Sequence, residues 1–520
     1  MKISKKNLVS VIVLTGMLSF SIFANAAVPD TRGHWAAAQI EKWVNNGIIN
    51  GYPDGTFRPN STITRAEFAS IASKLFNYVD KAGTDFTDVS NTAWYSDAVK
   101  KAYAAGIIAG FNGKFNPNNK ITRQEAAIIL AKAFKLTPQD DNTSDYFNDA
   151  GKISSWSKGY INVIISNGYM SGRPGNILAP TDYITRAETV ALINKISGAY
   201  INTSGEYTTD IPDNLVITSP DVTLRNITIE GDLILAQGIG DGAVTLDGVH
   251  ISGRTVVLGG GEDSIAINNS SLIGKLVVDK KDGKVGIVMQ GTSSAADVLL
   301  QSGSKLVEQG MGMGFGSIEI AAANEKSISL EGNFEQINID GNNLQLNIPH
   351  GTINDLTVGR SAANINVQLG ETAEIITLQA DAASTFSGAG TIMLANISAN
   401  NVVIENPPGA VNIVEGVTAT VAGEQVSSST GFPAGAEDSG STDIAVNSIN
   451  IISESTTVGI GGTLQLNSSV LPSNATDKTV TWSVANGTGS AAISENGLLT
   501  ATKAGTVTVI AVNEISSADR

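Results

Sequence analysis

The sequence predicts a multidomain chain in three parts: a helical unit made of three repeats, a long all-β region of stacked coils, and a small C-terminal β-sandwich. The motif Ile-Thr-Arg-Ala/Gln-Glu occurs three times before residue 200. Beyond residue 201, apolar residues alternate with polar ones and short runs recur about every 22 residues. From about residue 444, short alternating runs are separated by turn residues. At 520 residues the chain is also too long for a single core.

The N-terminus predicts a signal peptide. Three lysines (Lys2, Lys5 and Lys6) precede an apolar run over residues 8–23, and Ala24-Asn25-Ala26 is a small-residue cleavage site. Residues 1–26 are therefore expected to be removed. No other segment approaches the ~20 apolar residues of a membrane span. The mature chain is expected to be secreted, with no membrane partner after cleavage.

Composition limits the chemistry and the partners. The chain has no cysteine, which excludes disulfides, thiolate catalysis and Cys-ligated metals. Residues 27–200 have a net charge of +3, whereas residues 201–520 have a net charge of −22. The first part can approach a polyanion, but the second would be repelled by one unless cations bridge the two. We expect no nucleic-acid partner and no cofactor, with Ca²⁺ the metal ion that the acidic part could bind.

Each repeat predicts two helices joined by a polar loop. Apolar residues at helical spacing end at a glycine (Gly47, Gly106 or Gly168), a loop rich in Gly, Pro and Asn follows, and the shared motif then begins the second helix. The predicted repeats span residues 27–82, 83–140 and 141–200.

The motif has the residues of a capping box, in which a threonine and a glutamate three positions later each bond a backbone N–H at the helix start. We interpret these residues as structural; they are Thr64 with Glu67, Thr122 with Glu125, and Thr185 with Glu188.

The arginine inside each motif is harder to explain by the helix alone. Arg65, Arg123 and Arg186 each fall in a first helical turn, where the helix dipole disfavours a cation by about 0.3–1 kcal/mol. Free N–H donors at a helix start, together with a guanidinium, form a good carboxylate site. The sequence therefore predicts that these arginines bind acidic ligand groups. The alternative is a salt bridge to a neighbouring Asp.

A longer pattern surrounds the motif in every repeat. The first repeat has His34-Trp35-Ala36 and Gly-Ile-Ile-Asn-Gly-Tyr-Pro-Asp-Gly-Thr-Phe-Arg-Pro at 47–59. The second and third have Phe-Thr-Asp at 86–88 and Phe-Asn-Asp at 147–149, each followed by a tryptophan. Over residues 27–200 this pattern resembles S-layer homology (SLH) domains of Gram-positive-type cell surfaces.

The resemblance implies an α-helical pseudo-threefold unit whose grooves bind secondary cell-wall polysaccharide carrying pyruvate ketals. The third repeat lacks the acidic loop residue that Asp54 supplies in the first, which predicts a weaker third groove. The glycan-binding residues implied are Arg65, Arg123, Arg186, Trp35, Trp94, Trp156, Asp54, Gly51 and Gly110.

Residues 201–424 predict a β-solenoid, with a β-sandwich as the alternative. Val222-Thr223-Leu224 recurs as Val244-Thr245-Leu246, and the run 344–348 recurs at 365–369, as expected for coils that stack on one another. Parallel β-helices often carry polysaccharide lyases and hydrolases. The acidic residues of this region are scattered at turn positions, and we identify no catalytic or metal-binding constellation.

Residues 425–443 predict a Ser/Gly/Ala-rich linker. Beyond it, residues 444–520 resemble a bacterial Ig-like group 2 (BIG2) domain through Thr481-Trp482-Ser483 and the strand spacing, with Trp482 as the core tryptophan. The last strand of the family pattern is missing beyond Asn513, which predicts a truncated domain.

The predicted function is that of a non-catalytic cell-surface or S-layer protein, anchored non-covalently to pyruvylated secondary cell-wall polysaccharide. Further copies of the chain in a surface lattice would be a second partner. The alternative is an SLH-anchored carbohydrate-active enzyme with its site on the β-solenoid.

Overall fold

The computed structural model describes residues 29–83, 86–281, 283–310, 312–322, 326–428, 448–453, 457–471, 477–486 and 488–513. The chain divides into two compact units, residues 1–322 with 326–328, and residues 323–325 with 329–520. The predicted signal peptide and residues 429–443 of the predicted linker lie outside the described residues.

Each repeat folds as two α-helices joined by a loop, as the sequence predicts. The glycine that follows the first helix has a φ of 72° at Gly47, 73° at Gly106 and 69° at Gly168, a left-handed conformation that glycine adopts without strain. The helices are α1 (Ala37–Asn45), α2 (Arg65–Leu75), α3 (Ser96–Ala104), α4 (Arg123–Ala133), α5 (Lys158–Ser166) and α6 (Arg186–Ser197), with short 3₁₀-helices η1 (Pro29–Thr31), η2 (Thr143–Tyr146) and η3 (Ala150–Lys152).

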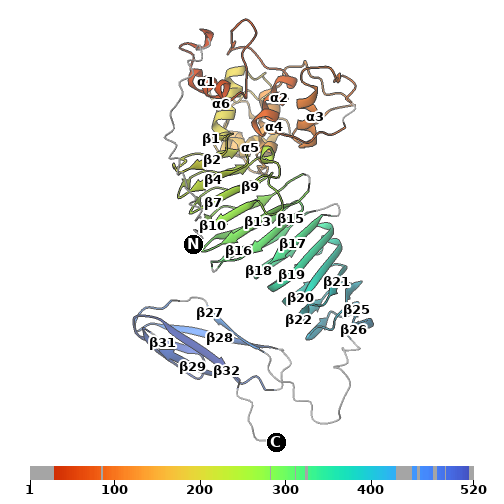
Figure 1. Ribbon diagram of the computed structural model, residues 1–520, viewed down its shortest axis with the longest axis vertical. Coiled ribbons are helices and arrows are strands. Elements are labelled where there is room, and N and C mark those ends of the chain that lie inside the picture. Colours follow the sequence, from red (N-terminus) through yellow and green to blue (C-terminus); the bar gives the residue numbers. More distant parts are fainter. Residues whose placement is uncertain are drawn as a thin grey trace, which may run out of the picture. The chain divides into compact units, whose positions relative to one another are not determined.

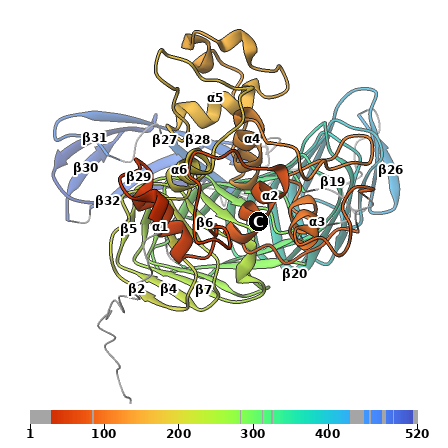
Figure 2. The same cartoon turned by 90° about the horizontal axis from the view of Figure 1, so that it is seen from above.

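Three backbone hydrogen bonds close the repeats into a ring. The Ile63 N–H donates to the Ile184 carbonyl at 3.2 Å, Ile184 to Ile121 at 3.1 Å, and Ile121 to Ile63 at 3.1 Å. The second helix of each repeat packs against the first helix of the next, α2 on α3, α4 on α5 and α6 on α1. Helices α2, α4 and α6 lie toward the middle, with α1, α3 and α5 outside them (Figure 2). This is the pseudo-threefold arrangement that the resemblance implies.

The strands that follow the helices in the first unit form a parallel β-solenoid, and they stack as successive rungs in Figure 1. Val222 pairs with Val244, and Val244 pairs with Ile265, in parallel register. These are the positions whose spacing predicts the coil, so the β-sandwich alternative is wrong for this region. The strands of the first unit are β1 (Ala199–Ile201), β2 (Gly205–Tyr207), β3 (Leu215–Ile217), β4 (Val222–Arg225), β5 (Thr228–Ile229), β6 (Leu233–Leu235), β7 (Val244–Asp247), β8 (His250–Ile251), β9 (Thr255–Val257), β10 (Ile265–Asn268), β11 (Ser271–Leu272), β12 (Leu276–Val278), β13 (Val285–Gln290), β14 (Ser294–Leu300), β15 (Ser304–Glu308) and β16 (Gly314–Ile320), with η4 at Gln237–Ile239.

The solenoid strands of the second unit also pair in parallel, at positions that the sequence repeat predicts. Leu344 pairs with Ile365 in parallel, as the repeat of the two runs predicts. The last turn ends in an antiparallel hairpin of β25 and β26, so residues 425–427 belong to a strand and not to the predicted linker. Strand β17 (Ser327–Glu331) has residues of both units, and the other strands are β18 (Phe334–Ile339), β19 (Asn342–Val358), β20 (Ala363–Ala380), β21 (Ser384–Gly388), β22 (Thr391–Ile397), β23 (Val402–Ile404), β24 (Ala410–Ile413), β25 (Thr418–Val421) and β26 (Glu424–Ser427).

Within the first unit, the helical repeats dock on an apolar stripe of the solenoid. One strand in each of the first turns carries an apolar or aromatic residue at its outward-facing centre. These residues are in register and are Tyr200, Val216, Ile234, Val256, Val277 and Leu299. They pack into the same hydrophobic core as the helices. The next residue in register, Glu319, is charged, so the stripe ends where the docked surface ends.

Polar groups of the solenoid also bind the C-terminal ends of the central helices. Arg254 donates to the carbonyls of Phe134 and Lys135 just beyond α4, at 3.2 and 2.7 Å. The Gly238 N–H donates to the Phe76 carbonyl after α2 at 3.1 Å, and Asn214 donates to a carbonyl near the end of α6. The solenoid thus satisfies carbonyls that a helix end leaves unpaired.

Residues 448–513 form antiparallel strands at the positions that the BIG2 resemblance predicts. Strand β27 pairs with β28, β28 with β31, β30 with β31, and β29 with β32. Trp482 is half-buried, and its ring lies close to Gly497. The strands are β27 (Ser448–Ser453), β28 (Thr463–Leu471), β29 (Thr481–Asn486), β30 (Ser490–Ile493), β31 (Leu498–Lys503) and β32 (Val507–Val512).

Candidate functional site

The candidate site is built at the starts of α2, α4 and α6, where the shared motif places the same residues three times. Each start forms the capping box that the sequence predicts. In the first, the Thr64 hydroxyl accepts from the Glu67 N–H at 3.2 Å, and the Glu67 carboxylate accepts from the Thr64 N–H at 2.7 Å. The capping residues therefore have a structural role in every repeat.

The expectation of free N–H donors at these helix starts is wrong. The Arg65 and Ala66 N–H groups donate to the carbonyls of Asn119 and Pro117 in the second repeat, at 2.9 and 3.0 Å. The same two positions of α4 donate into the third repeat, and those of α6 donate into the first. Because the ring brings carbonyls of one repeat onto the helix start of another, these donors are satisfied inside the protein.

The motif arginines tie neighbouring repeats together. The Arg123 guanidinium donates to the carbonyls of Leu178 and Ser171 at 3.0 and 2.9 Å, and its Nη1 lies 3.1 Å from a Glu188 carboxylate oxygen. Arg65 makes the equivalent bonds to Phe115, Ala109 and Glu125, and Arg186 donates to the carbonyls of Phe57 and Asn50. Arg123 and Arg186 are each 4% exposed. Burial lowers the pKa of both from its ordinary value, and the acidic partner is a Glu instead of the Asp considered from the sequence.

Two arginines form ion pairs with the Glu188 carboxylate. Besides Arg123, the Arg173 side chain reaches the same carboxylate oxygen with Nε at 3.0 Å and Nη2 at 2.9 Å. Burial raises the pKa of Glu188, but the bond from the Thr185 N–H and the two arginines outweigh it, so the net pKa lies below its ordinary value. The carboxylate is therefore charged at neutral pH and holds both cations in place.

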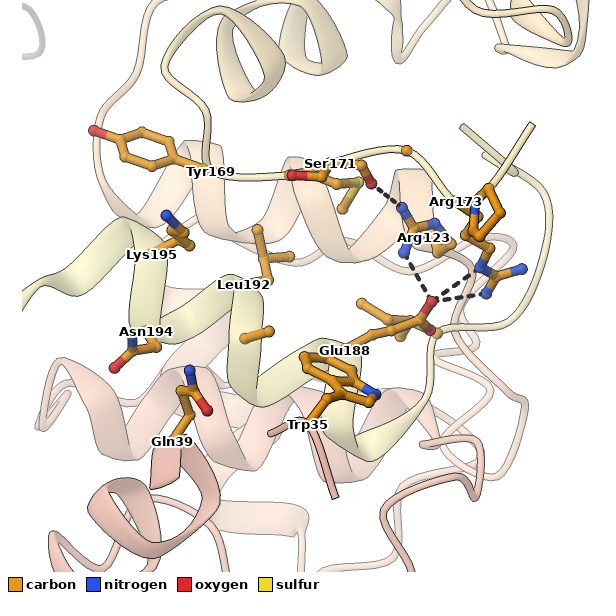
Figure 3. A pocket seen from close by; sticks show the side chains of 15 residues that line it. Trp35, Gln39, Arg123, Tyr169, Ser171, Arg173, Glu188, Leu192, Asn194 and Lys195 are labelled. Atoms are coloured by element: carbon orange, nitrogen blue, oxygen red, sulfur yellow. Dashed lines mark hydrogen bonds and ion pairs between the residues drawn. The ribbon is translucent and has the colours of Figure 1, made fainter. Parts of the chain in front are cut away.

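A groove of about 660 Å³ lies beside this cluster, between the third repeat and the first. Its walls are α6, the loop around Arg173, and Trp35 with Gln39 of the first repeat. Figure 3 shows Arg123 and Arg173 converging on Glu188 at one end, with Trp35 beside them. Lys195 also lines the groove, and the Gln39 Oε1 atom is buried with no hydrogen-bond partner among the described residues.

The three tryptophans predicted as binding residues are all exposed. Trp35, Trp94 and Trp156 are 62%, 69% and 60% exposed, and each lies just before the first helix of its repeat. Trp43, in contrast, is fully buried in the helical core. A large aromatic side chain left in water three times at one position is a candidate contact surface.

The loop residues of the predicted site have local structural reasons. Asp54 accepts hydrogen bonds from the Thr56 hydroxyl and N–H and pairs with Arg58, which lowers the pKa of Asp54 to about 2. A Cβ at Gly51 would lie 2.9 Å from the Thr56 carbonyl oxygen, and one at Gly110 would lie 2.3 Å from the Phe86 ring. Gly51 is therefore required by a carbonyl of its own loop, and Gly110 by the ring of Phe86 packed against it.

Three segments of the chain match the model of the S-layer homology domain, residues 29–69, 85–127 and 146–190. The chain carries three SLH repeats. Residues 445–519 match the bacterial Ig-like domain (group 2), and residues 314–431 match Toastrack DUF4097.

The chain is similar to several surface proteins and to enzymes that share the SLH repeats. It is 30% identical over 289 residues to S-layer protein EA1 of Bacillus anthracis, covering 52% of this chain and 32% of that protein. It is 32% identical over 175 residues to a cellulosome-anchoring protein of Acetivibrio thermocellus, covering 32% and 39%. Exoglucanase XynX of the same organism is 34% identical over 186 residues, covering 35% and 17%.

The chain thus spans at most 39% of the length of these relatives, and the enzymes match only in the SLH region. The SLH repeats and the surface-protein relatives support anchoring at the cell surface, at the cell wall or in an S-layer. None of the helices in the described residues is long and apolar enough to cross a membrane.

The sequence argument assigned no role to two sets of residues that recur in the SLH repeats. The carboxylates of Asp30, Asp88 and Asp149 each accept two consecutive backbone N–H groups of their own repeat, so they fix the segment that leads into the shared motif. A lysine also recurs seven residues after each motif glutamate. These lysines are Lys74, Lys132 and Lys195, and among the three it is Lys195 that lines the groove at Trp35; their fixed spacing is the signal that could have found them.

Proposed function

We propose that this chain is a non-catalytic cell-surface protein, held to pyruvylated secondary cell-wall polysaccharide through the grooves between its SLH repeats. The observation that carries the proposal is the groove between the third and first repeats. There the exposed Trp35 ring lines the same groove as Arg173 and Lys195. Aromatic faces stack on sugar rings, and cations bind the carboxylate of a pyruvate ketal.

In this proposal the motif arginines form the floor of the grooves. A guanidinium has five N–H donors, and the bonds described for Arg65 use three of them. The rest are available to a ligand oxygen, while the carbonyl bonds hold the guanidinium in place. Trp94 and Trp156, with Asp54, Gly51 and Gly110, shape the other two grooves. The third repeat has Arg173 at the position that Tyr52 holds in the first repeat and Phe111 in the second. This is the repeat for which the sequence predicts a weaker groove.

The test measures binding of the mature chain to purified cell walls, before and after chemical removal of pyruvate. We expect Trp35→Ala to weaken binding at least about tenfold, since a stacked aromatic ring contributes more than its buried area alone. The matched control is Tyr146→Ala, an exposed aromatic residue that does not line the groove. Equal binding of both variants, or binding that is unaffected by pyruvate removal, would overturn the proposal.

A further inference from the structure

A second hollow lies where the first SLH repeat meets the first turns of the solenoid. It has a volume of about 430 Å³. Lys74 and Asn77, at the C-terminal end of α2, form one side, and Asn202 and Ser219 of the solenoid form the other. The hollow is separate from the groove at Trp35, which has none of these residues in its walls.

Some polar side chains of the hollow bond within the protein, as Asn46, Thr218 and Ser219 do, but three others do not. Lys74, Asn77 and Asn202 are exposed, and their side chains make no hydrogen bond or ion pair within the described parts of the chain. Other polar groups at this junction are engaged: Arg254 and Asn214 both bond helix carbonyls. Three polar side chains around one hollow are therefore free to bond a ligand, in a junction where Arg254 and Asn214 are already paired.

The threefold arrangement gives an internal comparison. Asn77, Lys135 and Gly198 occupy the same left-handed position after α2, α4 and α6, with φ of 47°, 52° and 57°. Lys135 is used for docking, because its Nζ pairs with Asp279 of the solenoid at 2.5 Å. A Cβ at Gly198 would lie 2.1 Å from the Asn214 carbonyl oxygen, so no side chain fits there. Only at the first of these three positions is the side chain left beside open space.

The lining also points to the class of ligand. It contains three asparagines, a lysine, a serine, a threonine and the ring of Tyr200, and it has no Asp or Glu although the chain has 49. Amides offer a donor and an acceptor side by side, which matches neighbouring hydroxyls of a sugar, and a lysine ammonium donates to hydroxyl or acidic oxygens. A metal ion is disfavoured because no carboxylate is present.

We propose that this hollow is a saccharide subsite that binds a sugar unit of the wall polysaccharide outside the SLH grooves. The inference rests on the proposed function for the source of the sugar. The solenoid then supplies part of the wall-binding surface through Asn202, and a long polysaccharide contacts both the groove and the hollow. A short pyruvylated fragment that fills a groove alone does not need the hollow.

The test uses the full mature chain and two probes, isolated wall polysaccharide and a pyruvylated monosaccharide glycoside. The double variant Lys74→Ala with Asn202→Ala should bind polysaccharide at least about fivefold more weakly, as expected from two lost hydrogen bonds, and should bind the monosaccharide unchanged. Lys152→Ala, another exposed lysine, is the matched control. Asn202→Asp is a second variant, which places a carboxylate in the hollow and should also weaken polysaccharide binding.

If the unmodified chain binds polysaccharide and both hollow variants bind it equally well, the subsite is overturned and the proposed function stands. If the unmodified chain binds neither probe, the proposed function itself fails. Weaker binding of the monosaccharide by the double variant would also contradict the inference, because it would place the effect in the grooves.

Discussion

Replacing Arg123 by Met separates the two roles that a motif arginine can have. The side chain is 4% exposed, and it loses two hydrogen bonds to carbonyls, at Leu178 and Ser171, and one to Glu188. A hydrogen bond from a charged donor contributes about 1.5–3 kcal/mol, and a carbonyl left buried without a partner adds to the loss. Glu188 keeps Arg173 as a partner, and Met restores part of the packing. We expect the free energy of unfolding of the helical unit to fall by about 3–5 kcal/mol.

The assay is urea unfolding of the mature chain, followed by circular dichroism at the helix band and by tryptophan fluorescence. Lys195→Met is the control, because Lys195 is exposed in the same groove and its loss should change stability by no more than about 0.5 kcal/mol. A stable Arg123→Met variant that no longer binds cell walls would refute the structural role and make the arginine a ligand group. An unstable variant that keeps its wall affinity at low temperature would show the reverse.

Four other predictions test the junction, the caps, the charge of the groove and assembly. Arg254→Ala should lower the stability of the first unit by about 2–4 kcal/mol in urea unfolding, because it leaves two helix carbonyls without their partner and leaves Asp232 with only the backbone N–H of residue 254. The half-exposed Arg225, changed to Ala as a control, should cost at most about 1 kcal/mol; equal losses would contradict the docking argument. Thr122→Ala should cost about 0.5–2 kcal/mol through the lost cap, with wall affinity unchanged; a loss of affinity without destabilisation would make the hydroxyl a ligand contact. Since the folded pKa of Glu188 is below its ordinary 4.5, its contribution is present above about pH 4.5 and is lost as the pH falls through the folded value. Glu188→Gln should flatten this part of the pH profile of the urea midpoint, and an unchanged profile would contradict the assignment. Finally, Ca²⁺ at millimolar-order concentration should increase light scattering by the mature chain, whose residues 201–520 have a net charge of −22. If NaCl at equal ionic strength has the same effect, screening explains it and the lattice fails.

The sequence predicted the structure correctly where that structure depends on a local pattern of residues. The capping boxes follow from Thr and Glu three positions apart, a rule that depends only on the helix itself. The solenoid register follows from the spacing of Val222, Val244 and Ile265, because stacked coils bring equivalent residues together. The three tryptophans were placed in the candidate site through the resemblance to SLH domains, and all three are exposed.

By itself, therefore, the sequence determined the three SLH repeats, their helices and caps, the coil period of the solenoid and the Ig-like strands. Only the tertiary structure decided what the motif arginines touch, since their partners Leu178, Ser171 and Glu188 lie about 50 to 65 residues away from Arg123. The sequence argument treated each helix start as solvated, but ring closure covers it with carbonyls of another repeat. The docked stripe and the hollow at Lys74 and Asn202 were likewise decided by tertiary contacts. An outward apolar residue in a strand shows that something covers it, but only the packed chain shows which segment does.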